Sequence, residues 1–273
     1  MTVRIDAADL LDLAERAARA AGDLLRTRTD TESMAPGSEV AVLDTKTSPT
    51  DVVTAMDKAS ERLLRETLLG ARPDDGFLGE EGADDTGASG VRWVVDPIDG
   101  TVNYLYGIPQ YAVSIGVEVD GLVVAGVVHN PVSGETWTAL RGRGARLDGR
   151  PIAVSTLTDV SFALVGTGFG YAASRRARQA EVAAELLPQV RDVRRMGSAA
   201  IDLCFVASGR FDAYYEQGLN PWDLAAGGLI AAEAGAVVGG AYGAAAGVDL
   251  VIAAPPALFE ALHDRVARLS ATG

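Results

Sequence analysis

The apolar positions of the first 70 residues repeat at the spacing of amphipathic helices. One run covers residues 6–28, and a second covers residues 53–69, with Thr50 and Asp51 in front of it as candidate N-cap residues. The stretch 29–50 between them is polar and contains proline and glycine, which favour a loop. We therefore expect two helices joined by a long loop.

Short apolar runs then predict buried strands. Residues 77–79 and 91–95 are each followed by acidic residues, which indicates strands whose ends open onto a polar site. Residues 111–140 contain three further runs separated by turn signals, and the Asp120-Gly121 pair between the first two is typical of a tight hairpin. This region is expected to form an antiparallel meander.

A shift in composition near Pro151 divides the sequence into two parts. We expect a first lobe over residues 1–150 and a second over residues 151–273. In the second lobe strands alternate with helices, which indicates helices that cover a largely buried sheet. The expected strands are 161–166, 191–196 and 211–216, the expected helices are 174–187, 198–208, 222–235 and 256–269, and the tract 239–247 is expected to be a turn between two strands.

Composition and charge limit the possible functions. Hydrophobic residues make up 48% and charged residues 22% of the 273 positions, which is enough for a sizeable core. The net charge of −13 argues against a general affinity for nucleic acid or for an anionic membrane, although a bound cation can still attract an anionic substrate. The first residues carry charges among the apolar positions, so a secretory signal is not expected, and the cytoplasm is the expected location.

Reactive side chains are scarce. Cys204 is the single cysteine and lies in an apolar run, where burial is expected, and His129 and His263 are the only histidines. These three residues do not suffice for a zinc site, and a nucleophile activated by histidine would depend on an isolated imidazole. Any bound metal is expected to be a hard cation held by oxygen atoms, such as Mg²⁺, Mn²⁺ or Ca²⁺.

The segment DPIDGT is the first candidate for chemistry. Asp96 follows an apolar strand that Pro97 is expected to end, and Asp99 lies one turn further on, so both carboxylates can share metal ions. Gly100 permits close approach of the backbone to a ligand, and Thr101 is expected to start a short helix. The alternative is a simple hairpin turn, but proline does not suit one, and two crowded aspartates repel each other without a partner.

Three further acidic segments each have an ordinary structural explanation. Glu80 and Glu81 can belong to a solvated loop, and the polar residues of 46–57 can be helix caps. Asp223 can stabilise the start of the helix over 222–235 through the helix dipole. None of these segments supports a functional site alone.

Together the four segments resemble the inositol monophosphatase family. The matching motifs are DPIDGTVNY, the upstream GEE, SPTDVVTAMD and WDLAAGGLIAAEAG, and the resemblance extends from the first helix to residue 254. Two departures are Tyr104, where the family more often has phenylalanine, and a shortened tract over 239–250. The resemblance implies an α/β fold, an αβαβα five-layer sandwich with an antiparallel sheet in the N-terminal lobe, a mixed sheet in the C-terminal lobe and the site between them.

The resemblance also assigns roles to individual residues. Metal ligands are expected at Glu80, Asp96, Asp99, Asp223 and the main-chain carbonyl of Ile98. Asp57, Thr101 and Glu80 are expected to act on the attacking water, and Gly100 and Thr101 to bind the phosphate. Asp99, Ala199, Glu216 and Asp223 are expected to face the alcohol, and Lys46 to lie in a loop that can form a third metal position. For Glu216 the alternative is a surface carboxylate at a strand end.

The implied reaction is Mg²⁺-dependent hydrolysis of a small phosphate monoester, with inositol monophosphate as the expected substrate. Two or three ions are expected to activate water and to stabilise the leaving alkoxide, with in-line attack and no phosphoenzyme. Inhibition by Li⁺ and a homodimer are implied as well.

Other functions fit the same pattern less well. Histidinol phosphate, fructose 1,6-bisphosphate and phosphoadenosine phosphates are alternative substrates of the scaffold, and a binding protein without catalysis is the alternative class. The arginines of the runs 175–178 and 191–195 are the only candidates for contact with an anionic partner, and solvated faces explain them more simply.

Overall fold

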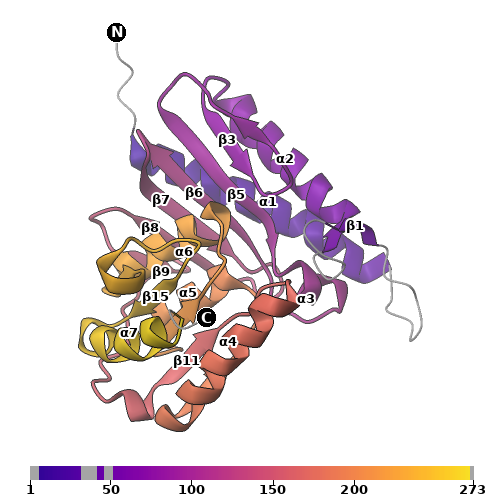
Figure 1. The fold of residues 1–273 in the computed structure, drawn as a ribbon. Helices are drawn as coiled ribbons and strands as arrows, with labels where there is room; N and C mark the ends of the chain where they lie inside the picture. Colours follow the sequence, from indigo (N-terminus) through magenta and orange to yellow (C-terminus); the bar gives the residue numbers. More distant parts are fainter. Residues whose placement is uncertain (1–5, 32–41, 46–51, 271–273) are drawn as a thin grey trace.

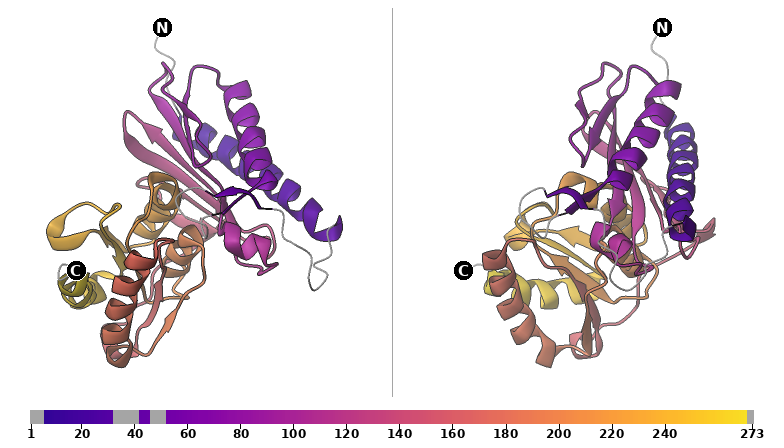
Figure 2. Two further views of the ribbon diagram at one scale, coloured as in Figure 1. Left: turned by 45° about the vertical axis from the view of Figure 1, so that its right-hand side comes forward. Right: turned by 90° about the vertical axis from the view of Figure 1, so that its right-hand side faces the viewer.

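Five layers of helix and sheet stack across the molecule, as the resemblance implies (Figures 1 and 2). The computed structural model describes residues 6–31, 42–45 and 52–270. The α-helices in these ranges are α1 (Ala7–Thr31), α2 (Ala55–Ala71), α3 (Thr101–Leu105), α4 (Ala173–Leu186), α5 (Ala199–Ala207), α6 (Pro221–Glu233) and α7 (Pro256–Ser270). Helices α1 and α2 cover one face of an eight-stranded sheet, α5 and α6 lie between it and a five-stranded sheet, and α4 and α7 form the outer layer. None of these helices combines the length and apolar character that a membrane span requires.

The larger sheet contains the predicted meander. Its strands are β3 (Gly76–Gly79), β4 (Asp84–Asp85), β5 (Val91–Asp99), β6 (Ala112–Val119), β7 (Leu122–His129), β8 (Thr136–Leu140), β9 (Ala145–Leu147) and β10 (Arg150–Pro151), in the order β10-β9-β8-β7-β6-β5-β3-β4. The meander is confirmed, because β6, β7 and β8 pair antiparallel, with Asp120 and Gly121 at positive φ in the first turn. The expectation of a purely antiparallel sheet is wrong at one pair. Strands β3 and β5 are parallel, because β4 reverses the chain on the far side of β3.

Strand β5 continues past Pro97, contrary to the sequence prediction. It pairs with β6 as far as Asp99, and the register shifts between Asp96, opposite Ser114, and Asp99, opposite Ala112. The shift inserts an extra residue into β5, and proline is tolerated in such a bulge because its nitrogen is not required to donate to the ladder. A bulge, rather than a strand end, therefore carries the two aspartates.

The smaller sheet is mixed, as expected. Its strands are β11 (Leu164–Thr167), β12 (Asp192–Arg194), β13 (Ala213–Glu216), β14 (Val237–Gly239) and β15 (Val251–Ala254), in the order β12-β11-β13-β15-β14. Tract 239–247 connects the antiparallel strands β14 and β15, which confirms the predicted turn, and it contains the 3₁₀ helix η3 (Ala241–Gly243). The predicted strand 161–166 begins later than expected, because the 3₁₀ helix η1 (Val160–Phe162) occupies its first residues. A further 3₁₀ helix, η2 (Leu187–Gln189), follows α4.

The start of α2 differs from the prediction. Thr54 is its N-cap, and its side chain accepts hydrogen bonds from the amides of the first turn. The predicted caps Thr50 and Asp51 lie outside the described residues. The region predicted as a loop also contains the strand β1 (Val42–Thr45), which pairs antiparallel with β2 (Val52–Thr54).

The middle layer packs closely on the larger sheet because glycines face it. A Cβ atom on Gly116 would lie 2.6 Å from the Ala225 Cβ, and one on Gly126 would lie 3.0 Å from the Ala226 Cα. Cys204 is fully buried in the same core, as predicted. Because this core combines residues from both halves of the chain, the division at residue 150 remains a prediction.

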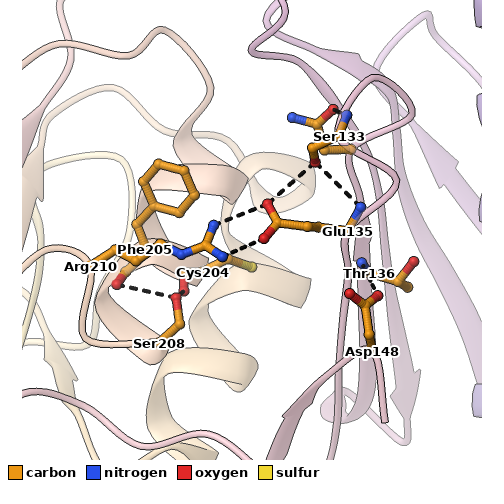
Figure 3. A network of polar contacts seen from close by, with 9 residues as sticks. Ser133, Glu135, Thr136, Asp148, Cys204, Phe205, Ser208 and Arg210 are labelled. Atoms are coloured by element: carbon orange, nitrogen blue, oxygen red, sulfur yellow. Dashed lines mark hydrogen bonds and ion pairs between the residues drawn. The ribbon is translucent and has the colours of Figure 1, made fainter. Parts of the chain in front are cut away.

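An ion pair joins the two halves beside this core (Figure 3). Arg210, which follows α5, donates two hydrogen bonds to Glu135 in the turn before β8, one of them 3.0 Å from Nη1 to Oε2. The guanidinium carbon also lies 5.1 Å from the centre of the Phe205 ring. These hydrogen bonds lower the pKa of Glu135, so the pair remains charged at neutral pH.

Candidate active site

A cavity of about 580 Å³ brings most of the predicted site residues together. It is bordered by the bulge of β5, the starts of α3, α5 and α6, the end of β13 and the loop between β11 and α4. The predicted residues that line it are Glu80, Asp96, Ile98, Asp99, Gly100, Thr101, Ala199, Glu216 and Asp223. Asp57 is fully buried and reaches the cavity only through its contact with Thr101. Lys46 lies outside the described residues.

Three carboxylates form the centre of this site. Asp96, Asp99 and Asp223 each offer an oxygen atom, and these atoms lie within 4.8 Å of one another. Asp96 and Asp99 are 1% and 8% exposed. The bulge of β5 supplies the first two carboxylates and α6 the third, so the cluster exists only where the two halves of the chain meet.

The charges of this cluster oppose one another. Burial and then the charges of Glu80, Asp99 and Asp223 raise the pKa of Asp96, and burial followed by Asp99 and Glu80 raises that of Asp223. Buried carboxylates this close are costly unless a cation pairs with them. A hard divalent cation such as Mg²⁺ fits the oxygen donors, and no histidine or cysteine is found among the described residues that line the cavity.

Asp99 is held by the N-terminus of α5. Its Oδ2 accepts hydrogen bonds from the Ser198 hydroxyl at 2.7 Å and the Ala200 amide at 2.6 Å, and its Oδ1 accepts one from the Ala199 amide at 3.3 Å. Burial raises the pKa of Asp99 to about 6, and these hydrogen bonds oppose the rise. Ala199, predicted to face the substrate, therefore also positions a carboxylate of the cluster.

Thr101 connects the cavity to Asp57. Its hydroxyl oxygen lies 3.1 Å from Asp57 Oδ1 and 3.0 Å from the Ile98 carbonyl oxygen, and its single proton can serve one of them at a time. Asp57 in turn accepts a hydrogen bond of 2.7 Å from the Thr54 amide, as part of the capping box of α2. Burial raises the pKa of Asp57. Asp57 therefore takes part in the capping box of α2 and also contacts the Thr101 hydroxyl.

The turn at Gly100 requires glycine. Its φ of 101° lies in the left-handed region, and a Cβ atom there would lie 3.0 Å from the Gln110 carbonyl oxygen and 3.1 Å from that of Gly197. Helix α3 begins at the next residue, so this conformation turns the chain from the bulge of β5 along the cavity wall.

Glu216, the last residue of β13, is half-buried and faces the cavity rather than the outer surface. A Cβ atom on Gly168 would lie 1.9 Å from its Oε2, so the glycine provides the space for it. The Tyr214 hydroxyl donates a hydrogen bond of 2.5 Å to the same oxygen. Burial raises the pKa of Glu216 to about 7, whereas Tyr214 and Arg195 act to lower it.

Asp223 both stabilises the start of α6 and belongs to the carboxylate cluster. Its Oδ2 accepts a hydrogen bond of 2.6 Å from the Asn220 amide, which completes a capping box at the start of α6. The helix thereby fixes the side chain that belongs to the carboxylate cluster.

The cavity wall also contains polar residues to which the sequence analysis gave no role. Among them are Arg175, Arg195, Ser198 and Asp202. The two arginines belong to the basic runs noted in the sequence, and a serine directly before a helix is a usual N-cap signal. Asp202 lies within the apolar run AAIDLCFVA, and this position is a signal of burial.

Three other arginines of these runs make contacts elsewhere. Arg176 donates to the Tyr171 carbonyl, Arg191 to the Phe162 carbonyl, and Arg194 forms an ion pair with Asp192. They serve local structure, which agrees with the simpler explanation of the basic runs.

Comparison with known proteins agrees with this geometry. The family model described as "Inositol monophosphatase family" matches residues 6–271. A relative from Mycobacterium leprae (strain TN), named Inositol-1-monophosphatase, is 50% identical over 228 residues, which cover 80% of this chain and 78% of the relative.

More distant relatives carry other names. The Nus factor SuhB of Pasteurella multocida (strain Pm70) is 39% identical over 261 residues, which cover 93% of this chain and 94% of that protein. Among solved structures, the extragenic suppressor protein suhB from Bartonella henselae has a TM-score of 0.86 at 34% identity, covering 94% of this chain and 98% of its own. The family match over nearly the whole sequence, and relatives of this similarity, show that the chain belongs to the inositol monophosphatase family.

Proposed function

We propose that this phosphatase hydrolyses an inositol monophosphate in the cavity described above. The observation that carries the proposal is the cluster of Asp96, Asp99 and Asp223, whose ligand atoms lie within 4.8 Å of one another on the cavity wall. Membership of the family and the name of the M. leprae relative support the choice of substrate.

Two or three Mg²⁺ ions are the proposed cofactors. The side chains of Glu80, Asp96, Asp99 and Asp223 and the carbonyl oxygen of Ile98 would hold them, since all five residues line the cavity and offer oxygen atoms. When bound, such ions lower the pKa of water and neutralise negative charge on the phosphate.

Thr101 and Asp57 are proposed to orient the attacking water. When the Thr101 hydroxyl donates its proton to Asp57, the lone pairs of the threonine oxygen can accept a hydrogen bond from water. Glu80 lines the same cavity and is proposed to share this task. The amides of Gly100 and Thr101, where α3 begins, are proposed to donate to the phosphate oxygens. No side chain bonds to phosphorus in this scheme.

The alcohol is proposed to lie against the second lobe. Asp99, Ala199, Glu216 and Asp223 would face it. Glu216 suits this position because a carboxylate repels phosphate but accepts hydrogen bonds from hydroxyl groups. The role of this residue is therefore recognition rather than chemistry.

Further parts of the proposal rest on the family resemblance. They are inhibition by Li⁺ and a homodimer, whereas a cytoplasmic location and no binding of nucleic acid are proposed from the charged N-terminal residues and the net charge of −13. The name Nus factor describes the P. multocida relative, and we propose hydrolysis, not that role, for this chain. The four carboxylates predicted as metal ligands all line the cavity, and this supports the choice.

Phosphate release from a panel of monoesters, measured with and without Mg²⁺, tests the proposal. Inositol 1-phosphate is expected to be turned over, with activity lost on treatment with a chelator and restored by Mg²⁺. A preference for histidinol phosphate or fructose 1,6-bisphosphate would overturn the proposed substrate. Failure to hydrolyse any ester would favour the binding-protein alternative.

A further inference from the structure

The buried face of α2 changes character along its length. In the second half of the helix this face is apolar and carries Leu64 and Leu68. In the first half, at the same helical spacing, it carries Asp57, Ser60 and Glu61, which are at most 8% exposed. Because buried polar side chains are costly unless they form hydrogen bonds, the partners of these three residues indicate what this end of the helix does.

Two of the three residues contact segment 96–101. The Thr101 hydroxyl oxygen lies 3.1 Å from Asp57 Oδ1, and the Ser60 hydroxyl donates a hydrogen bond of 3.2 Å to the Pro97 carbonyl oxygen. Pro97 belongs to the bulge of β5, which carries two of the proposed metal ligands. The polar end of α2 therefore supports this bulge from the side of the helix.

Glu61 contacts the segment that carries Glu80. Its Oε2 accepts a hydrogen bond of 2.8 Å from the Glu81 amide. The Glu80 amide donates a hydrogen bond of 3.2 Å to the Val95 carbonyl oxygen in β5. The two amides that flank the Cα atom of Glu80 are therefore both held, one by β5 and the other by α2.

Gly79 provides the space for the Glu61 carboxylate. A Cβ atom on Gly79 would lie 2.1 Å from Glu61 Oε2 and 2.6 Å from its Cδ. Gly79 is the last residue of β3, so the buried carboxylate lies against the strand end directly before Glu80. The side chain of Glu80 lines the cavity, and its charge is, after burial, the largest cause of the raised pKa of Asp96. Glu61 thus holds the backbone of a side chain that acts on the carboxylate cluster.

We propose that Glu61 is a positioning residue of the metal site, whose carboxylate fixes the peptide between Glu80 and Glu81 so that Glu80 faces the cavity. The proposal rests on the proposed function, in which Glu80 is a metal ligand. A ligand that is already fixed binds an ion more tightly than one that has to be ordered on binding, because less conformational entropy is lost. Removal of the Glu61 carboxylate is therefore expected to weaken Mg²⁺ binding although no ligand is removed.

Calorimetric titration with Mg²⁺ tests this role without depending on turnover. Glu61→Ala is expected to bind Mg²⁺ roughly 10- to 100-fold more weakly than the wild type. Glu61→Gln keeps an oxygen acceptor for the Glu81 amide and is expected to recover most of that loss. Glu66→Ala, at an exposed glutamate of the same helix, is the matched control and should bind Mg²⁺ as the wild type does. In phosphate release, Glu61→Ala should require more Mg²⁺ for half-maximal activity, with KM for the ester unchanged at saturating Mg²⁺.

Thermal unfolding shows whether the variants keep the fold. Glu61→Met retains much of the side-chain volume without an acceptor oxygen, and it replaces Glu61→Ala if that variant does not fold. Mg²⁺ binding by Glu61→Ala as tight as that of the wild type would overturn the positioning role and leave the proposed function standing. Equal losses in Glu61→Ala and Glu61→Gln would show that the charge of Glu61 acts on the ions directly, which would overturn the role as well. If the wild type binds no Mg²⁺, the proposed function and the positioning role both fail.

Discussion

The Thr101 hydroxyl has one proton and two acceptors, Asp57 Oδ1 at 3.1 Å and the Ile98 carbonyl at 3.0 Å. Thr101→Ala removes the oxygen that would orient water but leaves the carboxylate cluster in place. We predict a fall in kcat of roughly 10²- to 10⁴-fold with little change in KM. Thr67→Ala is the control, since that hydroxyl donates to the Leu63 carbonyl at 2.7 Å within α2. An effect mainly on KM would show that Thr101 binds substrate instead.

Glu216 allows recognition to be separated from chemistry. Glu216→Gln keeps the shape that Gly168 accommodates but removes the charge. We expect kcat/KM for inositol 1-phosphate to fall by roughly 10- to 150-fold, with little loss for p-nitrophenyl phosphate, which has no ring hydroxyl. The exposed Glu185→Gln provides the control. A similar loss on both esters would mean that Glu216 supports the metal site.

At the residue scale, the sequence predicted those side chains whose chemistry is visible in type and spacing. Asp96 and Asp99 flank a proline, and their crowding alone indicated a cation. The role of Ser198 was missed because it depends on α5 placing its N-terminus against a carboxylate that is about 100 positions earlier in the chain. Sequence spacing carries no information about such a contact.

At the element scale, the contact of α6 with the larger sheet leaves no room for a side chain at Gly116. The Cβ of Gly116→Ala would lie 2.6 Å from the Ala225 Cβ and would displace the helix that carries Asp223. We predict a loss of about 1–3 kcal/mol in the free energy of unfolding. Phosphate release should fall as well. Gly70→Ala, where nothing lies within 4 Å of the added carbon, should instead stabilise by about 0.4–1 kcal/mol. Denaturant unfolding of both variants checks this, and equal stabilities would contradict the packing.

Elements whose structure depends on local sequence were predicted well. Features that depend on pairing with a neighbouring strand were not. The helices and the Asp120-Gly121 hairpin follow from periodicity and turn chemistry. The bulge at Pro97 depends on the pairing with β6, and the parallel direction of β5 depends on where β4 lies. Neither partner can be identified from the strand itself.

At the scale of the whole molecule, the ion pair between Arg210 and Glu135 links the C-terminal half of the chain to the N-terminal half. Arg210→Ala is expected to reduce the free energy of unfolding by about 1–2 kcal/mol, through the lost ion pair and the lost contact with Phe205. Because Arg210 lowers the pKa of Glu135 from its ordinary value of 4.5, this contribution is present above that pH and is lost as the pH falls below it. Arg194→Ala, which breaks an exposed pair, should change stability by less than about 0.5 kcal/mol. Equal melting temperatures for wild type and Arg210→Ala at neutral pH would contradict the prediction.

The meeting of the two halves also creates the site. Asp99 comes from the larger sheet and is held by α5, and Asp223 comes from α6, so the cluster forms only in the assembled fold. Carboxylates this close together are costly unless a cation pairs with them. The central claim is that this cluster binds Mg²⁺.

Calorimetric titration with Mg²⁺ of the wild type, Asp96→Asn and Asp120→Asn tests that claim most directly. Asp96 is buried beside the charges of Glu80, Asp99 and Asp223, and Asp96→Asn removes the charge of a proposed central ligand. We predict that the wild type and Asp120→Asn bind Mg²⁺ alike, and that Asp96→Asn binds it roughly 10-fold or more weakly. Binding by Asp96→Asn as tight as that of the wild type, or no binding by the wild type, would contradict the account.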